Sequence, residues 1–331
     1  MSSGADWQPA ISPERLAARA ALLAQVRAFF AVRAVLEVDT PLVVNAAVSD
    51  PHIHSATVQL AASSGAPAAA SAAPLFLHSS PEYAMKRLLA AGSGDIYQIC
   101  HVVRALESGR LHNPEFTLIE WYRLGFSLTQ LMDEVEALVR TLLGPAATAR
   151  RSERLSYREA FQRALGLDPL GATRADLERA ARPLGFRPDV RSDRDEWLEL
   201  LMSTRIGPRL GHGALTFVQR YPASQAALAR LDPEDARLAL RFELYCDGIE
   251  LANGFEELAA PAEQRARFAR DDAERRRRGL PAAAPDERLL AALAAGLPAC
   301  AGVALGFDRT LMLATGAAHI EQVLPFPTAR A

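Results

Sequence analysis

Ionisable side chains lie within an otherwise apolar, strand-like stretch at residues 112–123. Because alternate side chains of an extended chain point to the same side, Phe116, Leu118, Glu120 and Tyr122 would share one face of a strand. A glutamate and a phenol that end an otherwise apolar face predict the floor of a pocket that binds something polar. This stretch is therefore the first candidate site in the chain.

The elements around this stretch must hold it in place. The run before it, residues 97–104, is the expected partner strand, and residues 105–113 form the loop between the two. An amphipathic helix is predicted from Pro13 to about Val35, because Ser12 suits the N-cap and proline the first helical position. Other predicted elements are a surface loop at residues 61–74, helical patterns at 128–143, 157–205 and 261–278, and strands at 216–218 and 241–254, the last a hairpin turning at Asp247–Gly248.

Composition limits the class of protein. With 331 residues, of which 50% are hydrophobic, the chain can bury the core of one large α/β unit. A net charge of −2 does not favour an extended surface that binds nucleic acid, because such a surface is normally basic. Cys100, Cys246 and Cys300 are widely spaced, which fits neither a disulfide framework nor a zinc site and indicates a reducing compartment. No signal peptide and no run of about 18 apolar residues is apparent, so we expect a soluble, cytoplasmic protein with no membrane partner.

Three segments resemble the signature motifs of the class II aminoacyl-tRNA synthetases, in the order in which that family carries them. The run FFAVRAVLEVDTP at residues 29–41 resembles motif 1. The arginine-ended strand, loop and return strand at residues 97–123 resemble motif 2, and GVALGFDR at residues 302–309 resembles motif 3. The run CDGIELANGFEE at residues 246–257 is similar to the metal and amino-acid strand of lysyl-tRNA synthetases.

Further runs narrow the resemblance. SPEY at residues 80–83, followed by MKRLL, and FVQRYPASQ at residues 217–225 are similar to the short lysyl-tRNA synthetase paralogues that attach (R)-β-lysine to elongation factor P. The resemblance implies an α+β fold, the class II synthetase catalytic domain, with an antiparallel sheet flanked by helices. It also implies a homodimer, since motif 1 lies at the class II dimer interface. We expect one domain over residues 1–331, with a mainly helical insertion at about 127–210.

The same resemblance implies a reaction. An AMP-forming ligase would join the amino acid to ATP as an aminoacyl-adenylate, with Mg²⁺ present, and would pass the (R)-β-lysyl or lysyl group to a lysine side chain of elongation factor P. Lysyl-tRNA synthetases carry an anticodon-reading OB-fold of roughly five strands before motif 1. Here only a short segment precedes Pro13. We therefore expect no OB domain and no anticodon-dependent binding of tRNA.

Two arginines are the expected catalytic residues, by their match to the family motifs. Arg104 would hold the α-phosphate and the attacking carboxylate, because a guanidinium fork fits a pair of anionic oxygens. A surface arginine is the alternative in so arginine-rich a chain. Arg309 would cover the adenine and reach the γ-phosphate, and Asn113 would contact ATP, although asparagine before proline is also a common turn residue. The motif match assigns the remaining ATP contacts to Ala105, Leu106, Glu107, Glu250, Leu251 and Gly306.

Carboxylates are the expected ligands of the metal and of the substrate amines. Magnesium is usually held by one or two carboxylates together with the substrate phosphates, and the motif match implies Glu250 and Glu257 for this role, with Glu257 preferred over Glu256. A diamino acid carries two cationic amines, which neutralise carboxylates gathered in one pocket. The resemblance implies substrate contacts at Ser80, Pro81, Glu82, Glu120, Tyr122, Asn253, Glu257 and Ala304.

Ala304 is the position expected to select the amino acid. Lysyl-tRNA synthetases carry glycine there, and one methyl at a packed pocket wall changes the choice of amino acid by about 1–3 kcal/mol. The alternative is that Ala304 is one of several small residues on a tightly packed strand. Both interpretations can hold together.

The chain departs from the family within motif 2. Ala105 and Leu106 stand where an Asn-Glu-like pair is expected, and His101 stands where an arginine is expected. Leucine cannot accept a hydrogen bond from the adenine amine, so Glu107 or the backbone would have to supply that contact. Two alternatives to the elongation factor P ligase stay open: a lysine–tRNA ligase-like enzyme that acts on tRNA, and a non-catalytic paralogue that binds an amino acid.

Overall fold

The computed structural model describes residues 7–59, 74–185 and 193–331. The chain divides into two compact units. Unit 1 takes its described residues from Met1–Leu124, Ala259–Ala299 and Gly306–Ala331, and unit 2 from Gly125–Leu258 and Cys300–Leu305. The loop expected at residues 61–74 lies, apart from Pro74, outside the described residues.

Unit 1 holds the described residues up to Leu124 and the later helices α8, α9 and α10. Strands β1, β5 and β6 lie side by side, with β1 parallel to β5 and β5 antiparallel to β6, and β2, β4 and β3 form a small antiparallel sheet. The elements are α1 (Pro13–Ala31), β1 (Leu36–Glu37), β2 (Val43–Val44), β3 (Thr57–Val58), β4 (Leu75–Leu77), α2 (Glu82–Ala90), β5 (Ile96–Val103), β6 (Glu115–Leu124), α8 (Pro261–Arg277), α9 (Glu287–Gly296), α10 (Phe307–Thr315), and the 3-10 turns η5 (Ile320–Val323) and η6 (Thr328–Arg330).

Helix α1 begins where the sequence predicts and ends earlier. Ser12 caps it by accepting a hydrogen bond from the Arg15 amide at 3.3 Å, and Pro13 occupies the first helical position. The predicted end near Val35 was wrong. Ala34 adopts a φ of 54° and the Val35 amide donates back to the Phe30 carbonyl, which closes the helix and releases the chain into β1.

Aromatic rings attach α1 to the β5–β6 pair. The ring of Phe30 stacks on Tyr97 at 4.3 Å between centroids and meets Trp121 edge-on at 5.3 Å. All three residues are buried. Because Tyr97 and Trp121 stand opposite each other in the ladder, α1 covers the sheet face to which they point.

Unit 2 is built on five strands in the order β11-β10-β9-β8-β7, all antiparallel except for the parallel pair β7–β8. Helix α3 packs on β9 and β10. The elements are α3 (Leu128–Leu143), α4 (Pro145–Thr148), β7 (Arg151–Ser156), α5 (Tyr157–Leu165), α6 (Arg174–Ala181), η1 (Arg182–Leu184), α7 (Arg194–Leu201), the π-helical turn η2 (Met202–Ile206), η3 (Gly207–Arg209), β8 (Ala214–Pro222), η4 (Ala223–Gln225), β9 (Leu238–Cys246), β10 (Ile249–Glu256) and β11 (Cys300–Gly306).

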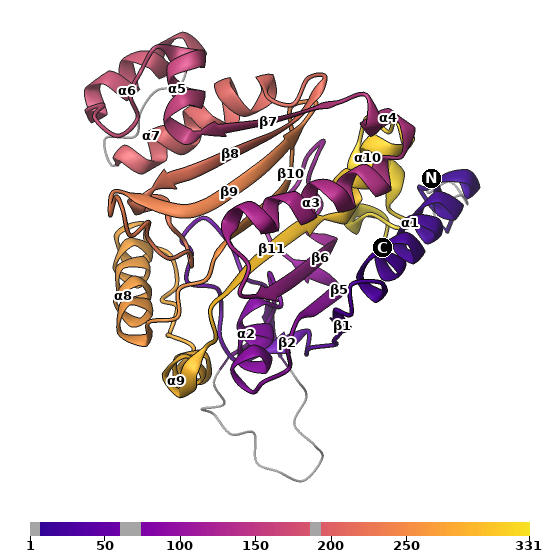
Figure 1. Ribbon diagram of the computed structural model, residues 1–331, viewed down its shortest axis with the longest axis horizontal. Coiled ribbons are helices and arrows are strands. Elements are labelled where there is room, and N and C mark those ends of the chain that lie inside the picture. Colours follow the sequence, from indigo (N-terminus) through magenta and orange to yellow (C-terminus); the bar gives the residue numbers. More distant parts are fainter. Residues whose placement is uncertain (1–6, 60–73, 186–192) are drawn as a thin grey trace, which may run out of the picture. The chain divides into compact units, whose positions relative to one another are not determined.

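A small core of its own holds α5, α6 and α7 together at one end of β7 and β8 (Figure 1). Phe161, Leu177 and Trp197, one from each helix, are buried in it. These helices fall within the predicted insertion at 127–210, and residues 186–192 of that range lie outside the described residues. The division into one domain with an insertion stays a prediction.

The predicted hairpin at residues 241–254 is present as β9 and β10. Asp247 and Gly248 form its turn with φ values of 49° and 75°, the pair of left-handed residues that a tight two-residue turn needs. Arg150 fixes Asp247 through hydrogen bonds of 2.8 and 2.5 Å. With helices in both units and mostly antiparallel strands, the α+β fold class is confirmed. Within the described residues, no helix has the length and apolarity needed to cross a membrane.

Candidate active site

The β5–β6 ladder places the expected pocket residues on one face. Gln98 on β5 stands directly opposite Glu120 on β6, and directly opposite residues share a face. Tyr97 points to the other face, where it meets Phe30. The predicted alternation is therefore confirmed from Glu115, where β6 begins, and Glu120 and Tyr122 lie on the face away from α1. Residues 112–114 belong to the loop before the strand.

Glu120 is a buried carboxylate that accepts hydrogen bonds at both oxygens. Ser80 Oγ donates to Oε2 at 2.7 Å, and the Tyr122 hydroxyl donates to Oε1 at 2.7 Å. Burial, and after it the negative charge of Glu82, raises the pKa of Glu120 to about 7. A carboxylate with this pKa becomes ionised readily when a cation binds beside it.

Helix α2 supplies the next acidic group. Pro81 is its N-cap, and the Glu82 amide donates to Ser80 Oγ at 3.0 Å, which orients the serine towards Glu120. The ammonium of Lys86, one turn further on and buried, donates to Glu82 Oε1 at 2.6 Å. The structure thus brings Ser80, Glu82, Glu120 and Tyr122 together in one acidic cluster of unit 1.

A second cluster gathers two arginines beside the loop between β5 and β6. Arg309 Nη2 lies 2.7 Å from His112 Nε2. Since a guanidinium can only donate, Nε2 accepts and the imidazole carries its proton on Nδ1. Burial, and then the charges of Arg309 and Arg104, lower the pKa of His112, while Glu107 acts in the opposite direction. The two arginine side chains therefore lie near a neutral histidine. The sequence did not indicate this role for His112, because His112 and Arg309 are far apart in the chain.

Arg104 extends beyond this cluster along the same sheet face as Glu120. Its guanidinium lies over the Phe116 ring at 5.1 Å, and Nη1 donates to Glu107 Oε1 at 3.3 Å. Its buried Nε makes no hydrogen bond to any of the described residues. The arginine is thus held in place by Phe116 and Glu107.

The loop residues predicted to contact ATP differ in their surroundings. Leu106 is 72% exposed, and Ala105 is fixed through its amide, which donates to the His54 carbonyl at 2.8 Å. Asn113 is buried, and its amide nitrogen donates to the Glu115 carbonyl at 2.6 Å and to Thr328 Oγ1 at 3.1 Å. The protein therefore uses the Asn113 side chain to close its own loop, and an ATP contact by that side chain stays a prediction.

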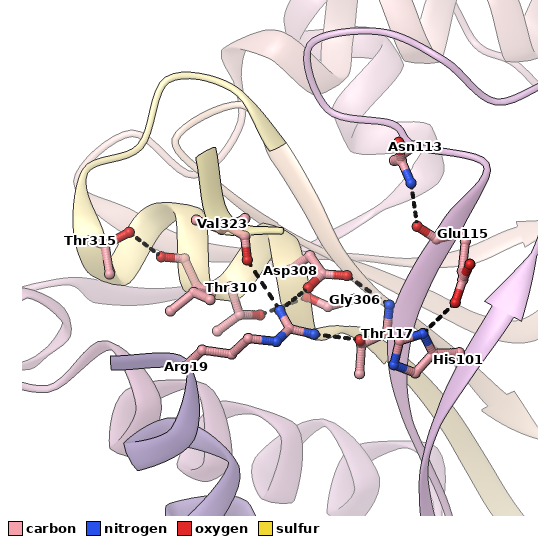
Figure 2. A network of polar contacts seen from close by, with 11 residues as sticks. Arg19, His101, Asn113, Glu115, Thr117, Gly306, Asp308, Thr310, Thr315 and Val323 are labelled. Carbon is pink, nitrogen blue, oxygen red and sulfur yellow. Dashed lines mark hydrogen bonds and ion pairs between the residues drawn. The ribbon is translucent and has the colours of Figure 1, made fainter. Parts of the chain in front are cut away.

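A buried ion pair fixes the start of α10, which carries Arg309 (Figure 2). Arg19 of α1 donates to Asp308 Oδ1 at 2.5 Å and to Thr117 Oγ1 at 2.7 Å. The second oxygen of Asp308 accepts from the Thr117 amide at 2.7 Å. Gly306 is the residue before the helix, and its carbonyl accepts from Thr310. Through these contacts α1, β6 and α10 set the position of Arg309.

In unit 2, three polar or small residues stand in one row across β9, β10 and β11. Asn253 pairs with Glu243 on one side and with Ala304 on the other. Arg241 crosses this row, since its Nε donates to Asn253 Oδ1 at 3.2 Å and its Nη2 to Glu243 Oε1 at 2.6 Å. Gly254 next to the row is required by packing, because a Cβ there would come within 2.9 Å of its neighbours on β9 and β11.

The predicted metal ligands both lie in unit 2. Glu250 is partly exposed near the start of β10, whereas Glu257 is buried just beyond its end. Burial, followed by the charges of Glu243 and Glu250, raises the pKa of Tyr245, so these two carboxylates face the same region. Leu251, the residue after Glu250, is buried. Glu243 is thus a carboxylate near Glu250 that the sequence analysis missed, because it sits on β9 outside the matched motif.

Within the described residues, no group of three or more His, Cys, Asp or Glu side chains is gathered tightly enough to hold a metal by itself. Two carboxylates with hard oxygen donors still fit magnesium, whose other ligands are normally water and substrate phosphate. The residues present therefore suit a metal that arrives with ATP.

Comparison with known proteins identifies the family of the chain. Residues 6–330 match the family described as tRNA synthetases class II (D, K and N). The chain is 49% identical to a Vibrio cholerae protein named elongation factor P–(R)-β-lysine ligase, over 99% of this chain and 100% of that protein. Proteins of the same name from Yersinia enterocolitica and Salmonella dublin are 48% and 46% identical, each over 100% of both chains. The chain belongs to the class II tRNA synthetase family.

Proposed function

We propose that this chain is an ATP-dependent ligase that activates (R)-β-lysine, or lysine, as an aminoacyl-adenylate and transfers it to a lysine side chain of elongation factor P. The observation that carries the proposal is the buried Glu120 carboxylate, held by Ser80 and Tyr122 and ready to pair with a substrate ammonium. The names of the relatives, which match along their whole length, supply the acceptor.

Activation requires the substrate carboxylate to attack the α-phosphorus of ATP. The new bond joins a carboxylate oxygen to phosphorus, and the bond to pyrophosphate breaks. Arg104 would neutralise the negative charge that grows on the α-phosphate, and its confined guanidinium costs little reorganisation. Arg309, fixed through Asp308, would hold the remaining phosphates and the adenine.

Magnesium would neutralise the phosphate oxygens of ATP when both are bound. Glu250 and Glu257 are the predicted ligands, whereas both oxygens of Glu243 already accept hydrogen bonds, from Arg241 and from the Tyr245 hydroxyl. The chain's own part would be to present Glu250 and Glu257 on β10 and just beyond its end.

Transfer needs no further cofactor. The ε-amine of the acceptor lysine attacks the acyl carbon, an amide forms, and AMP leaves with the bonding electrons while the amine loses a proton. Asn253 and Ala304 remain predicted contacts of the amino acid, with Ala304 favouring the β-isomer. We further propose a homodimer, from the resemblance to motif 1, and a cytoplasmic enzyme, because its acceptor is a translation factor.

ATP–pyrophosphate exchange tests the activation step. The assay compares (R)-β-lysine, α-lysine and an amino acid without a second amine, and the two diamino acids should support exchange. Glu120→Gln is the matched variant, since it keeps the shape of the side chain and removes its charge. Exchange that does not depend on a diamino acid would contradict the proposal, and absence of exchange with every amino acid would favour the non-catalytic paralogue.

A further inference from the structure

Gln98 is a buried amide that has only the weakly bonding Cys100 thiol as a polar contact among the described residues. The residue is 1% exposed, and neither its Oε1 nor its Nε2 makes a hydrogen bond to any of the described residues. Such groups are rare in folded proteins, because a buried amide without partners loses its hydration and gains nothing in return. An unused amide at this depth points to a ligand that completes it.

The β-ladder places this amide beside the acidic cluster. Gln98 stands directly opposite Glu120, and opposite side chains in an antiparallel pair have Cβ atoms roughly 5 Å apart. The neighbouring Tyr97 faces α1, so Gln98 points to the other side, with Glu120 and Tyr122. The oxygens of Glu120 already accept from Ser80 and Tyr122 and not from Gln98.

The thiol of Cys100 is the next polar group along the same face of β5. Burial, followed by the charge of Glu120, raises the pKa of Cys100 to about 12, and the Gln98 amide acts against this rise. A thiol is only a weak hydrogen-bonding partner, so this neighbour does not satisfy the amide. The region between Glu120 and Gln98 therefore offers one carboxylate and one carbonyl oxygen to an incoming group.

We propose that Gln98 is a further substrate-binding residue, whose side-chain carbonyl accepts a hydrogen bond from the same ammonium of the diamino acid that pairs with Glu120. The inference rests on the proposed function. An ammonium carries three N–H donors, so one carboxylate leaves donors over, and a neutral amide oxygen adds an acceptor without a further negative charge. A substrate carboxylate is excluded from this position by Glu120 and is drawn to Arg104 on the same face.

The proposal predicts opposite effects on stability and on binding. Gln98→Met keeps the length of the side chain and removes both polar atoms, so the free protein should unfold at a temperature equal to or higher than the parent, because an unsatisfied buried group has gone. Binding of the diamino acid, measured by calorimetry with α-lysine and (R)-β-lysine, should weaken by roughly ten- to a hundredfold, the usual effect of losing a hydrogen bond to a charged group. Affinity for ATP should stay unchanged.

Gln264 on α8 provides a matched control. It is also 1% exposed, and its Nε2 makes no hydrogen bond to the described residues. Gln264→Met should therefore leave the affinity for the diamino acid as it is in the parent. Gln98→Leu is the second variant in case the thioether packs badly, with the same expected outcome.

The possible results separate the assignment of Gln98 from the proposed function. A lower unfolding temperature for both Gln98 variants would mean that the free protein already satisfies the amide, and unchanged affinity for the diamino acid would mean that the amide does not meet the substrate. Either result overturns the assignment of Gln98 alone. A parent protein that binds neither diamino acid would instead overturn the proposed function.

Discussion

Replacing Arg19 with methionine should destabilise the protein strongly. The change leaves the Asp308 carboxylate, whose side chain is 2% exposed, without its ion-pair partner, and removes the hydrogen bonds to Thr117 and to the Val323 carbonyl. The Arg19 side chain is itself only 11% exposed. Removing one member of a buried ion pair costs about 3–5 kcal/mol, because the remaining charge stays buried. We therefore expect a loss of that order in the free energy of unfolding.

Arg27 on the same helix is the matched control. Its ion pair with Glu37 is longer, at 3.2 Å against 2.5 Å for Arg19–Asp308, and its two side chains are 52% and 42% exposed. Exposed pairs contribute about 0–1 kcal/mol and are screened by salt. Urea unfolding of Arg19→Met and Arg27→Met, each at low and at high salt, separates the two cases. If Arg19→Met loses no more stability than Arg27→Met, the interpretation of the Arg19–Asp308 pair as a buried support is wrong.

The same substitution should also affect the use of ATP. Asp308 fixes the first turn of α10, and Arg309 follows it directly. In Arg19→Met enzyme that is still folded at low temperature, the KM for ATP should rise more than the KM for the amino acid. Equal changes in both constants would indicate a general loss of structure.

Three other changes test the account. Glu250→Gln should abolish adenylate formation and leave the unfolding temperature near that of the parent, because it removes a predicted magnesium ligand from a partly exposed position; near-normal pyrophosphate exchange would rule this role out. Leu106→Glu should tighten ATP binding, measured by calorimetry, because an exposed apolar side chain would gain an acceptor for the adenine amine, and unchanged affinity would place the adenine elsewhere. Because the pKa of Glu120 is raised to about 7 from 4.5, the free protein should lose stability as the pH rises through this range, whereas affinity for the diamino acid should increase as the carboxylate ionises; Glu120→Gln should flatten both profiles.

Local sequence patterns predicted the helices and turns well where the conformational preferences of single residues determine the backbone conformation. Ser12 and Pro13 start α1, and Asp247 and Gly248 turn the β9–β10 hairpin, as their conformational preferences predict. The alternation within residues 112–123 correctly predicted the face that carries Glu120, because successive side chains of an extended strand point to opposite faces. The end of α1 was misjudged because it depends on the pairing of β1 with β5, a contact distant in sequence.

The roles of several polar residues could not be read from the sequence, because they depend on partners brought in by the fold. His112 accepts from Arg309, and Glu243 lies beside Arg241 and near Glu250. Gln98 is notable only once its strand partner and its missing hydrogen bonds are known. The motif match supplied Arg104 and Glu120, but it carries no information on which donors around them are already occupied.

Acyl transfer to elongation factor P is the reaction that distinguishes the proposed ligase from an enzyme that acts on tRNA. Purified enzyme, ATP, Mg²⁺ and (R)-β-lysine would be incubated with elongation factor P, and the mass of the acceptor would be measured by mass spectrometry, with Arg104→Met enzyme as the inactive control and tRNA as the competing acceptor. The account predicts that elongation factor P gains one β-lysyl group on a lysine side chain and that tRNA gains none. An unmodified elongation factor P beside an aminoacylated tRNA would contradict it.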